Sequence, residues 1–522
     1  MFLFKKSNRR NVKKLKNRKS RSFGAEMLEA RDLMAADIAL SNGILSIQGD
    51  NNSETITVRT APFVQKASFS AALTPVQSFG SVPLLQLQVT VVDNSANTTT
   101  SEYFSPWLVN ELVIDTGNGT NTVNVQVAIP ATITGGGGID RIYGGSADDI
   151  IFGGGNRDYL DGRGGEDSVY GQSGNDYLFG GSHADLLDGG PGIDRLYGQN
   201  GDDELIGGTS TDYLYGGNHD DILRGGSSRD YLYGQNGDDQ LVGDSGNDVL
   251  NGGNDDDALI GGIGADSMIS GSGRDRFLVT QGDGDTVADK STLDAKINFI
   301  NTTSDQDVLL GSNIGEVTAE ADSWTSAEIE TIDESFQLLF DATGNNELLK
   351  KHDGTELQFI RYGDIEDSDG DENTSVLGWN GGDEIVVINN AFESGWIAET
   401  VIHEIAHNFD EQHENSFVDD FRDAGTWQHL AFWQSKSGYT AAEDDNWGGF
   451  WSGWYYETSS TDEFARTYGQ MNPLEDFATA FTAKILSDSG NDYFSESAED
   501  VQDRMGGGDR FEVLDDFFAS LS

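Results

Sequence analysis

The chain has no cysteine, only 7 prolines and few positive charges among its 522 residues. The absence of cysteine excludes disulfide bonds, thiolate metal sites and a cysteine nucleophile. Because an exported chain without disulfides commonly needs another constraint on its unfolded state, bound metal is the natural alternative. The 66 glycines beside so few prolines are typical of repeated tight turns rather than of a disordered linker. This composition predicts a periodic fold.

The charge balance is strongly negative, with 89 acidic and 32 basic residues and a formal net charge of -57. Such a chain is not a nucleic-acid binder of the usual electrostatic kind, because that binding needs basic side chains to neutralise phosphates. Cations are the expected partners. No run of 18 apolar residues exists, so we expect no transmembrane segment.

The N-terminus differs from the rest, since ten of the basic residues lie between Lys5 and Arg21. We predict that residues 1–36 form a basic export or targeting tail, although a disordered basic tail is the simpler alternative. Glu26 and Glu29 interrupt the following stretch, so a standard secretory signal peptide fits poorly. Residues 27–35 resemble the Leu-Glu-Pro-Arg-x-Leu-Leu motif that opens many large exported proteins of certain bacteria, with Ala30 in place of the proline. That resemblance implies an extracellular bacterial protein, secreted or associated with the cell surface.

Residues 135–278 divide without a gap into sixteen units of nine residues with the form Gly-Gly-x-Gly-x-Asp-x-apolar-x. The eighth position is apolar in every unit, from Ile142 to Phe277. Some turns depart from the form, and glutamine stands at the second position at Gln172, Gln199 and Gln235, so some sites are expected to be weak or empty. The sixth position is aspartate in every unit: Asp140, Asp149, Asp158, Asp167, Asp176, Asp185, Asp194, Asp203, Asp212, Asp221, Asp230, Asp239, Asp248, Asp257, Asp266 and Asp275.

This pattern predicts a short strand and a turn in each unit. The last three residues form the strand with the apolar eighth residue inward, and the first six form the turn, where glycine permits positive φ. Each aspartate then lies beside backbone carbonyls, and such hard oxygen ligands suit Ca²⁺. The region holds 27 acidic and 8 basic residues, so its carboxylates would repel one another without cations. We therefore expect multiple structural calcium ions that are required for folding.

The repeat region resembles the RTX, or hemolysin-type, calcium-binding repeat family. That resemblance covers 144 residues and implies a right-handed parallel β-roll with two units per coil, in which the sixteen aspartates bind calcium.

The flanking regions have no such period. Residues 37–134 contain short strand-like segments and are predicted to be a β-rich cap that shields the first coil. Residues 279–322 are polar and are predicted to be a connector. A further domain is predicted over residues 323–522, beginning with a helix over residues 325–340 in which Thr325 is the N-cap and Glu328 completes a capping box.

The segment from Ile397 to Asp410 carries a His-Glu-x-x-His motif on a predicted buried helix. His403 and His407 are separated by one helical turn, so they project from one face and supply half of a tetrahedral zinc site. Glu404 is placed to deprotonate a zinc-bound water. Ordinary helix histidines are the alternative interpretation.

A catalytic zinc needs a third protein ligand, for which two candidates compete. His413 lies ten residues after His403, as in metzincins, but Asp410 occupies the place where that pattern requires glycine. Glu475 lies in the first turn of a helix predicted to begin after Asn472, where a capping role is its alternative.

The segment from Tyr468 to Phe481 resembles the gluzincin active site of anthrax lethal factor and similar bacterial peptidases. Carried over by residue, that resemblance implies His403, His407 and Glu475 as ligands of one catalytic zinc. It also implies Glu404 as the general base and Tyr468 as the oxyanion donor. Thr479 stands where the family usually has a second acidic residue, so the surroundings of the zinc are expected to differ.

Together these patterns predict a multidomain chain with a β-rich cap, a right-handed parallel β-roll and an α+β zincin-like metallopeptidase domain. The preferred hypothesis is a secreted calcium-binding zinc metallopeptidase that cleaves a peptide or protein substrate through a zinc-activated water. The alternatives are a calcium-dependent surface or matrix protein with an inactive zinc domain, and an adhesin that binds a partner through the β-roll.

Overall fold

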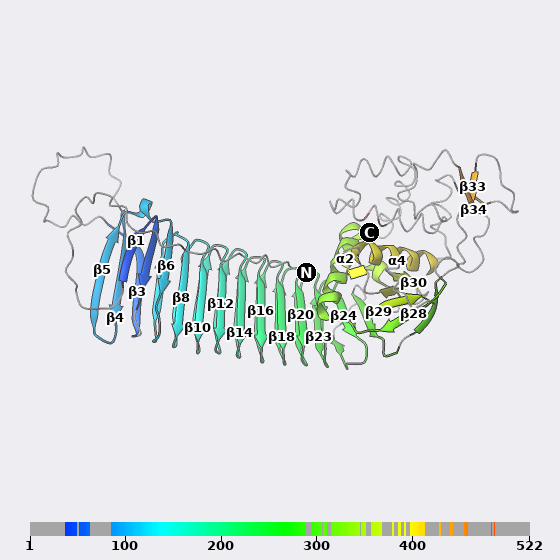
Figure 1. Cartoon of the computed structure of the whole chain (residues 1–522), viewed down its shortest axis with the longest axis horizontal. Coiled ribbons are helices and arrows are strands. Elements are labelled where there is room, and N and C mark those ends of the chain that lie inside the picture. Colours follow the sequence, from blue (N-terminus) through cyan, green and yellow to red (C-terminus); the bar gives the residue numbers. More distant parts are fainter. Residues whose placement is uncertain are drawn as a thin grey trace, which may run out of the picture. The chain divides into compact units, whose positions relative to one another are not determined.

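The structure is a computed structural model (Figure 1). It describes residues 37–49, 52–62, 85–288, 290, 294–304, 306–310, 315–344, 346–350, 356–367, 378–380, 385–387, 391–392, 397–412, 427–429, 439–441, 454–457, 482 and 485. The predicted export tail, residues 1–36, lies outside the described residues.

The repeat region folds into a parallel β-solenoid in which the chain alternates between two sheets. Ile150 of one strand pairs with Ser168 of the next strand in the same sheet, and Tyr159 pairs with Tyr177 in the other sheet. The offset of 18 residues means that two nine-residue units make one coil, as predicted for the β-roll. We call the two sheets sheet A and sheet B, and Figure 1 shows their strands standing side by side.

Sheet A runs along the solenoid with the strand order β8 (Ala131–Gly137), β10 (Ile150–Gly155), β12 (Ser168–Ser173), β14 (Leu186–Pro191), β16 (Glu204–Thr209), β18 (Ile222–Ser227), β20 (Gln240–Ser245), β22 (Ala258–Ile260) and β24 (Arg276–Thr280). Sheet B has the order β9 (Arg141–Tyr143), β11 (Tyr159–Gly164), β13 (Tyr177–Ser182), β15 (Arg195–Asn200), β17 (Tyr213–Asn218), β19 (Tyr231–Asn236), β21 (Val249–Asn254), β23 (Ser267–Ser272) and β25 (Thr286–Ala288).

Most of these strands are longer than the repeat pattern predicts. β11 contains six residues, which are the last three of one unit and the first three of the next. The glycines extend the ladder because their backbone groups keep parallel pairing, as in the pairing of Gly154 with Gln172. The prediction that the whole first six residues form a turn was therefore wrong, and the turn is confined to the middle of each unit.

The interior of the solenoid is a single column of apolar side chains. The eighth residues of all sixteen units, from Ile142 to Phe277, are 0% exposed and belong to one core cluster. Burying a leucine of this kind contributes roughly 1.5–3 kcal/mol. Because every unit contributes one such residue, the coils are held together along their whole length.

The predicted cap already contains coils of the solenoid. β2 (Ile44–Gln48), β6 (Glu111–Asp115) and β8 are parallel neighbours in sheet A, and β3 (Glu54–Pro62) and β7 (Thr122–Gln126) lead into β9 in sheet B. Antiparallel strands finish both sheets: β1 (Asp37–Ser41) beside β2, and β4 (Leu85–Asp93) and β5 (Thr98–Phe104) beyond β3. A 3₁₀ turn, η1 (Pro106–Leu108), precedes β6. The antiparallel strands cover the edges that the first parallel coil would otherwise expose.

The segment predicted as a connector is mostly structured. β26 (Ala295–Asn301) pairs in parallel with β24, so sheet A continues beyond the last repeat. β27 (Gln306–Leu310) and β28 (Gly315–Ala321) form an antiparallel hairpin. The polar composition hid an alternation in which Ala295, Ile297 and Phe299 are buried at every second position. The connector prediction for residues 279–322 was wrong for that reason.

The C-terminal region is joined to the solenoid through the same sheet. β29 (Leu357–Asp367) pairs in parallel with β26 and antiparallel with β28, and β31 (Ile385–Val387) lies between β29 and β30 (Gly378–Asn380). The predicted capping box is confirmed in α2 (Ser326–Thr343), which begins after Thr325 and ends at Gly344. The predicted helix with the His-Glu-x-x-His motif is α4 (Ile397–Gln412).

The remaining elements are short: η2 (Glu347–Leu349) and an antiparallel sheet of β32 (Trp427–His429), β34 (Trp454–Glu457) and β33 (Tyr439–Ala441). Within the described part of the chain, no helix is both long and apolar enough to span a membrane.

Candidate calcium-binding turns and candidate metallopeptidase helix

The turns of the solenoid need backbone conformations that favour glycine. The second position has φ of +112° at Gly154, and non-glycine residues in the same position adopt the same region, with +69° at Gln172 and +83° at Gln199. A Cβ on Gly154 would stand 1.9 Å from the carbonyl oxygen of Gly136 in the preceding coil. The repeated glycine therefore reflects both the left-handed conformation and the close stacking of coils.

The repeat aspartates form two ladders, one along each edge of the solenoid. The Oδ1 atom of Asp158 accepts the backbone N–H of Asp140 at 2.8 Å, and Asp167 Oδ1 accepts that of Asp149 at 2.7 Å. The same bond recurs every 18 residues through Asp275. One carboxylate oxygen of each aspartate is thus used to hold its coil to the preceding one.

Within the described part of the chain, the other carboxylate oxygen lacks a hydrogen-bond partner in all repeat aspartates but one. Each repeat aspartate except Asp149 has a buried Oδ2 atom that no group in the described part of the chain hydrogen-bonds. Asp149 Oδ2 accepts the backbone N–H of Gly145 at 2.6 Å. Ionised oxygens buried without a partner are costly, and a bound cation relieves that cost.

The electrostatics of the ladders agree with a need for cations. Burial raises the pKa of Asp158 to about 8, with the neighbouring Asp176 and Asp140 adding to the rise. Burial likewise raises the pKa of Asp212 to about 8 and that of Asp257 to about 9. A raised pKa means that the ionised form of the aspartate is disfavoured in its buried position. A divalent cation beside these oxygens would stabilise that form.

The donor set fits calcium better than a transition metal. Across the described ranges, no three His, Cys, Asp or Glu side chains gather as a metal cluster, so a cation here must also use main-chain oxygens. Such oxygens lie close by, since the carbonyl oxygen of Gly153 and Oδ2 of Asp140 stand 2.6 and 2.7 Å from the Cβ position of Gly135. A mixture of carboxylate and carbonyl oxygens is the coordination that Ca²⁺ prefers.

The ladders extend past the repeats that the sequence pattern identified. Asp266 donates its backbone N–H to Asp285 Oδ1 at 3.0 Å, and Asp275 donates to Asp294 Oδ1 at 3.3 Å. These steps are 19 residues rather than 18, so a strict nine-residue register misses them. For Asp285 the remaining signal was an apolar residue two positions later, Val287, whereas Lys296 stands two positions after Asp294.

The comparison with protein families agrees with this geometry. Seven overlapping segments between residues 132 and 277 match the RTX calcium-binding nonapeptide repeat. Residues 132–277 carry calcium-binding RTX repeats. Comparison with curated proteins yields no match for this chain. The RTX region therefore accounts for the two ladders, and calcium is the cation that they bind.

The candidate metallopeptidase helix α4 packs its apolar face into a second core. Val401, Ile402 and Ile405 are at most 1% exposed and share a cluster with Ile332 and Phe336 of α2. The next two positions after Ile402, His403 and Glu404, are half-buried. The helix thus holds these two side chains at the border between the core and the solvent.

The side chains of the other residues in the predicted zinc site lie outside the described residues. His407 belongs to α4, but its side chain lies outside the described residues. His413, Tyr468 and Glu475 also lie outside them. Both candidates for the third zinc ligand therefore stay predictions.

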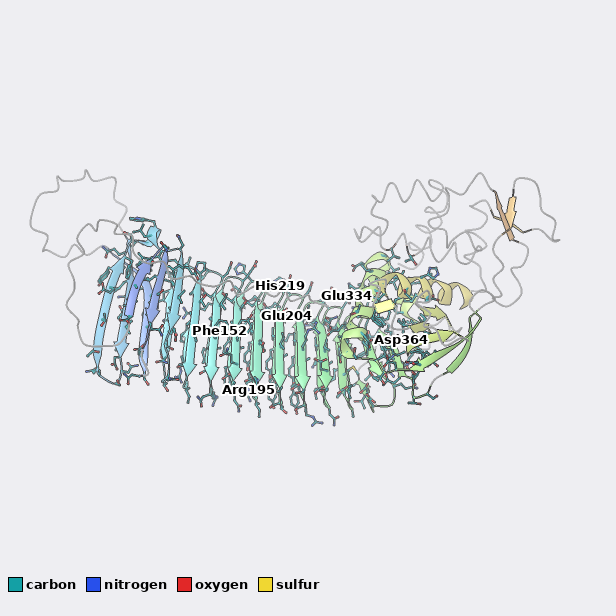
Figure 2. The ribbon with its side chains drawn as sticks, viewed as in Figure 1. Phe152, Arg195, Glu204, His219, Glu334 and Asp364 are labelled. Carbon is teal, nitrogen blue, oxygen red and sulfur yellow. The ribbon has the colours of Figure 1, made fainter. Side chains whose placement is uncertain are left out.

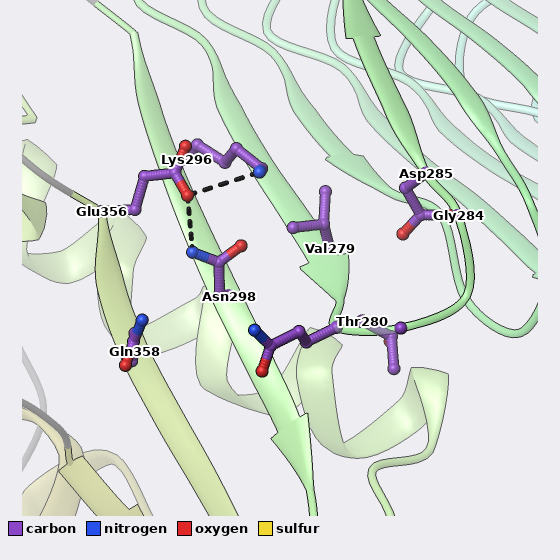
Figure 3. Close-up of a pocket in the computed structure, with 10 residues that line it drawn as sticks. Val279, Thr280, Gly284, Asp285, Lys296, Asn298, Glu356 and Gln358 are labelled. Carbon is purple, nitrogen blue, oxygen red and sulfur yellow. Dashed lines mark hydrogen bonds and ion pairs between the residues drawn. The ribbon is translucent and has the colours of Figure 1, made fainter.

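A polar pocket of about 430 Å³ lies where the solenoid meets β29 (Figure 3). Glu356 accepts hydrogen bonds from Asn298 at 2.7 Å and from Lys296 at 3.3 Å. Burial works against ionisation of Glu356, but these bonds outweigh it, so its pKa lies below the ordinary value. Lys296 and Glu356 of this pocket pair with each other, whereas Asp285, which also lines it, has a buried Oδ2 atom with no hydrogen-bond partner in the described part of the chain.

Proposed function

We propose that this chain is a secreted bacterial zinc metallopeptidase whose folding is set by calcium. The observation that supports the peptidase most directly is the position of His403 and Glu404, held half-buried by a helix whose other face is buried in the core. The His-Glu-x-x-His spacing and the later Tyr468–Glu475 segment supply the remaining parts of a gluzincin site.

In this proposal His403, His407 and Glu475 hold the zinc ion, with His413 as the alternative third ligand. Zinc, when bound, supplies a Lewis acid that makes water a nucleophile near neutral pH. The carboxylate of Glu404 accepts the proton of the attacking water and passes it to the leaving amine. The Tyr468 hydroxyl donates a hydrogen bond to the oxygen of the scissile carbonyl as negative charge develops there.

Calcium would control this site through α2, because α2 packs on sheet A. Val242, Ile260 and Leu278 of the solenoid share a core cluster with Ile329 of α2 and with α4. In the same interface Arg276, which directly follows the repeat aspartate Asp275, donates to Asp333 of α2 at 2.8 and 3.1 Å.

The Arg276–Asp333 contact is a buried ion pair, with both side chains 4% exposed. Gln337 of α2 accepts a further bond from Arg276 at 3.0 Å. Since the last coils need cations to form, the surface that positions α2, and through it α4, needs them too. Peptidase activity should therefore appear only where calcium is plentiful, as it is outside the cell.

The proposal is tested by elemental analysis of the purified protein together with a casein digestion assay. We expect one zinc per chain in the parent protein and loss of zinc in Glu475→Ala. Glu404→Gln should keep the zinc and lose turnover. If the parent binds no zinc, the chain is instead a calcium-dependent surface or matrix protein.

The Glu404→Gln result separates catalysis from folding. A Glu404→Gln protein that digests casein as fast as the parent would contradict the assignment of the general base. Zinc retained in Glu475→Ala but lost in His413→Ala would transfer the third ligand to His413.

A further inference from the structure

The outward face of sheet B carries a regular array of tyrosine and arginine. We define the tyrosine strip as the outward side chains of β9, β11, β13, β15, β17 and β19. Their aromatic rings are half-buried, whereas the residues between them point into the core. Sheet A differs, because part of its outward face is covered by α2.

The rings of the tyrosine strip stack on one another along the solenoid. Phe179, Tyr197, Tyr215 and Tyr233 follow one another with ring centroids 4.9–5.0 Å apart and planes within 5–7° of parallel. Because each ring face is covered by the ring of the next coil, the strip presents ring edges and phenol hydroxyls to the solvent. It offers few free ring faces on which a nucleobase or a sugar ring would stack.

The strip is also locally basic in a strongly acidic chain. Arg157, which precedes β11 and adjoins the strip, and Arg195 of β15, which is labelled in Figure 2, both lie over the ring of Tyr177, with guanidinium carbons 4.9 and 5.3 Å from its centroid. Arg163 lies 5.0 Å above the ring of Tyr143. The outward positions of these strands contain one carboxylate, Asp161. The net charge of the chain is -57, which repels anions, but the positive side chains of the strip allow an anion to approach this surface closely.

We propose that the tyrosine strip binds an extended polysaccharide that carries carboxylate groups. The array repeats once per coil along a straight line, which suits a linear polymer with a short repeat lying along the solenoid. Phenol hydroxyls exchange hydrogen bonds with sugar hydroxyls, and the planar guanidinium groups of Arg157 and Arg195 match carboxylates. An extended peptide would instead add to a sheet edge, whereas the strip is a sheet face.

The test uses the full-length protein in calcium, with hyaluronan as the acidic polysaccharide, dextran as the neutral one and poly-glutamate as an acidic polypeptide. We expect saturable binding of hyaluronan that weakens as salt is raised, and little binding of the other two. Equal binding of poly-glutamate would overturn the proposal in favour of an acidic protein partner. Equal binding of dextran would overturn the role of charge.

Matched variants locate the site. Arg157→Gln with Arg195→Gln should weaken hyaluronan binding at least tenfold, whereas Lys290→Gln, which removes one positive charge at an exposed residue off the strip, should leave it unchanged. Tyr213→Phe with Tyr231→Phe keeps their stacked pair but removes two hydroxyls, and should weaken binding several-fold. Tyr170→Phe, stacked on Phe152 of sheet A, is its control.

Circular dichroism in calcium verifies that each variant keeps the fold of the parent. Folded strip variants that bind hyaluronan as tightly as the parent would overturn the proposal, as would a lack of hyaluronan binding by the parent itself. Both results leave the peptidase proposal untouched, because that proposal depends on α4 and not on sheet B.

Discussion

The calcium-binding residues of the solenoid and the predicted zinc ligands of the α4 region are arranged in opposite ways. In the solenoid each aspartate takes part in the same bond with a residue 18 positions away, and the arrangement recurs in every coil. In the α4 region the predicted ligands His403, His407 and Glu475 occur once, and Glu475 is 68 residues beyond His407. A repeated site tolerates the loss of one member, whereas a single site does not. The two regions are nevertheless joined, because α2 packs on sheet A.

The largest effect that separates the two regions should come from removing calcium. With a chelator, the buried carboxylates lose their counter-ions, and the 27 acidic residues of the repeats repel one another. We expect the β-sheet signal in circular dichroism to collapse and to return on adding calcium but not magnesium, which demands a more rigid octahedral site. An unchanged spectrum in the chelator would mean that the core alone holds the coils.

Lowering the pH should partly restore the folding of the solenoid when calcium is absent. Burial raises the pKa of Asp185 to about 8 and that of Asp176 to about 7, above the ordinary aspartate value of 3.8. A folded-state pKa above the unfolded one means that the folded protein binds more protons, so this stabilisation is complete below pH 3.8 and is lost between about pH 6 and 9. In a chelator, the solenoid should gain β-sheet signal as the pH falls from 9 to 5. A loss of signal over that range would contradict the assignment.

Removing the Arg276–Asp333 ion pair, which joins the solenoid to α2, should have the next largest effect. Arg276→Ala leaves the carboxylate of Asp333 buried without its partner, which typically costs about 3–5 kcal/mol. Hydrogen exchange should then speed up in α2 and α4 while the early coils stay protected. Arg224→Ala is the matched control, since the Arg224–Glu330 pair is partly exposed and such pairs contribute about 0.2–1 kcal/mol. Equal effects of the two variants would argue against Arg276 as the link.

A substitution in a single turn of the solenoid should have the smallest effect on folding. Gly154→Ala forces alanine into a φ of +112° and against the Gly136 carbonyl, a conformation that costs about 1–2 kcal/mol before crowding is counted. Gly164→Ala is the control, because nothing lies within 4 Å of its Cβ position. We expect a higher calcium concentration for half-maximal folding in the first variant only. The shift should be small because the other coils compensate.

Prediction from sequence succeeded where a pattern repeats. The aspartates and the apolar eighth residues occur sixteen times, so the short strands and their inward residues follow from side-chain alternation, whereas the coil of two units was implied by the resemblance to RTX repeats. It failed where the same structure continues without the pattern. Asp285 and Asp294 extend the ladders after an inserted residue, and β26 hides its alternation in a polar stretch. For α4, the motif indicated the helix and its buried face, while convergence of its distant ligands stays a prediction.

By itself the sequence determined the nine-residue unit with its aspartate and its inward apolar residue, because a strict period needs no knowledge of the rest of the chain. It also determined the start of α2 through the Thr325–Glu328 capping box, whereas the helix ends at Thr343 rather than at the predicted residue 340. Only the tertiary structure decided that sheet A runs on into β29 and that Arg276 pairs with Asp333. Such contacts join segments with no common period, and burial is what selects them.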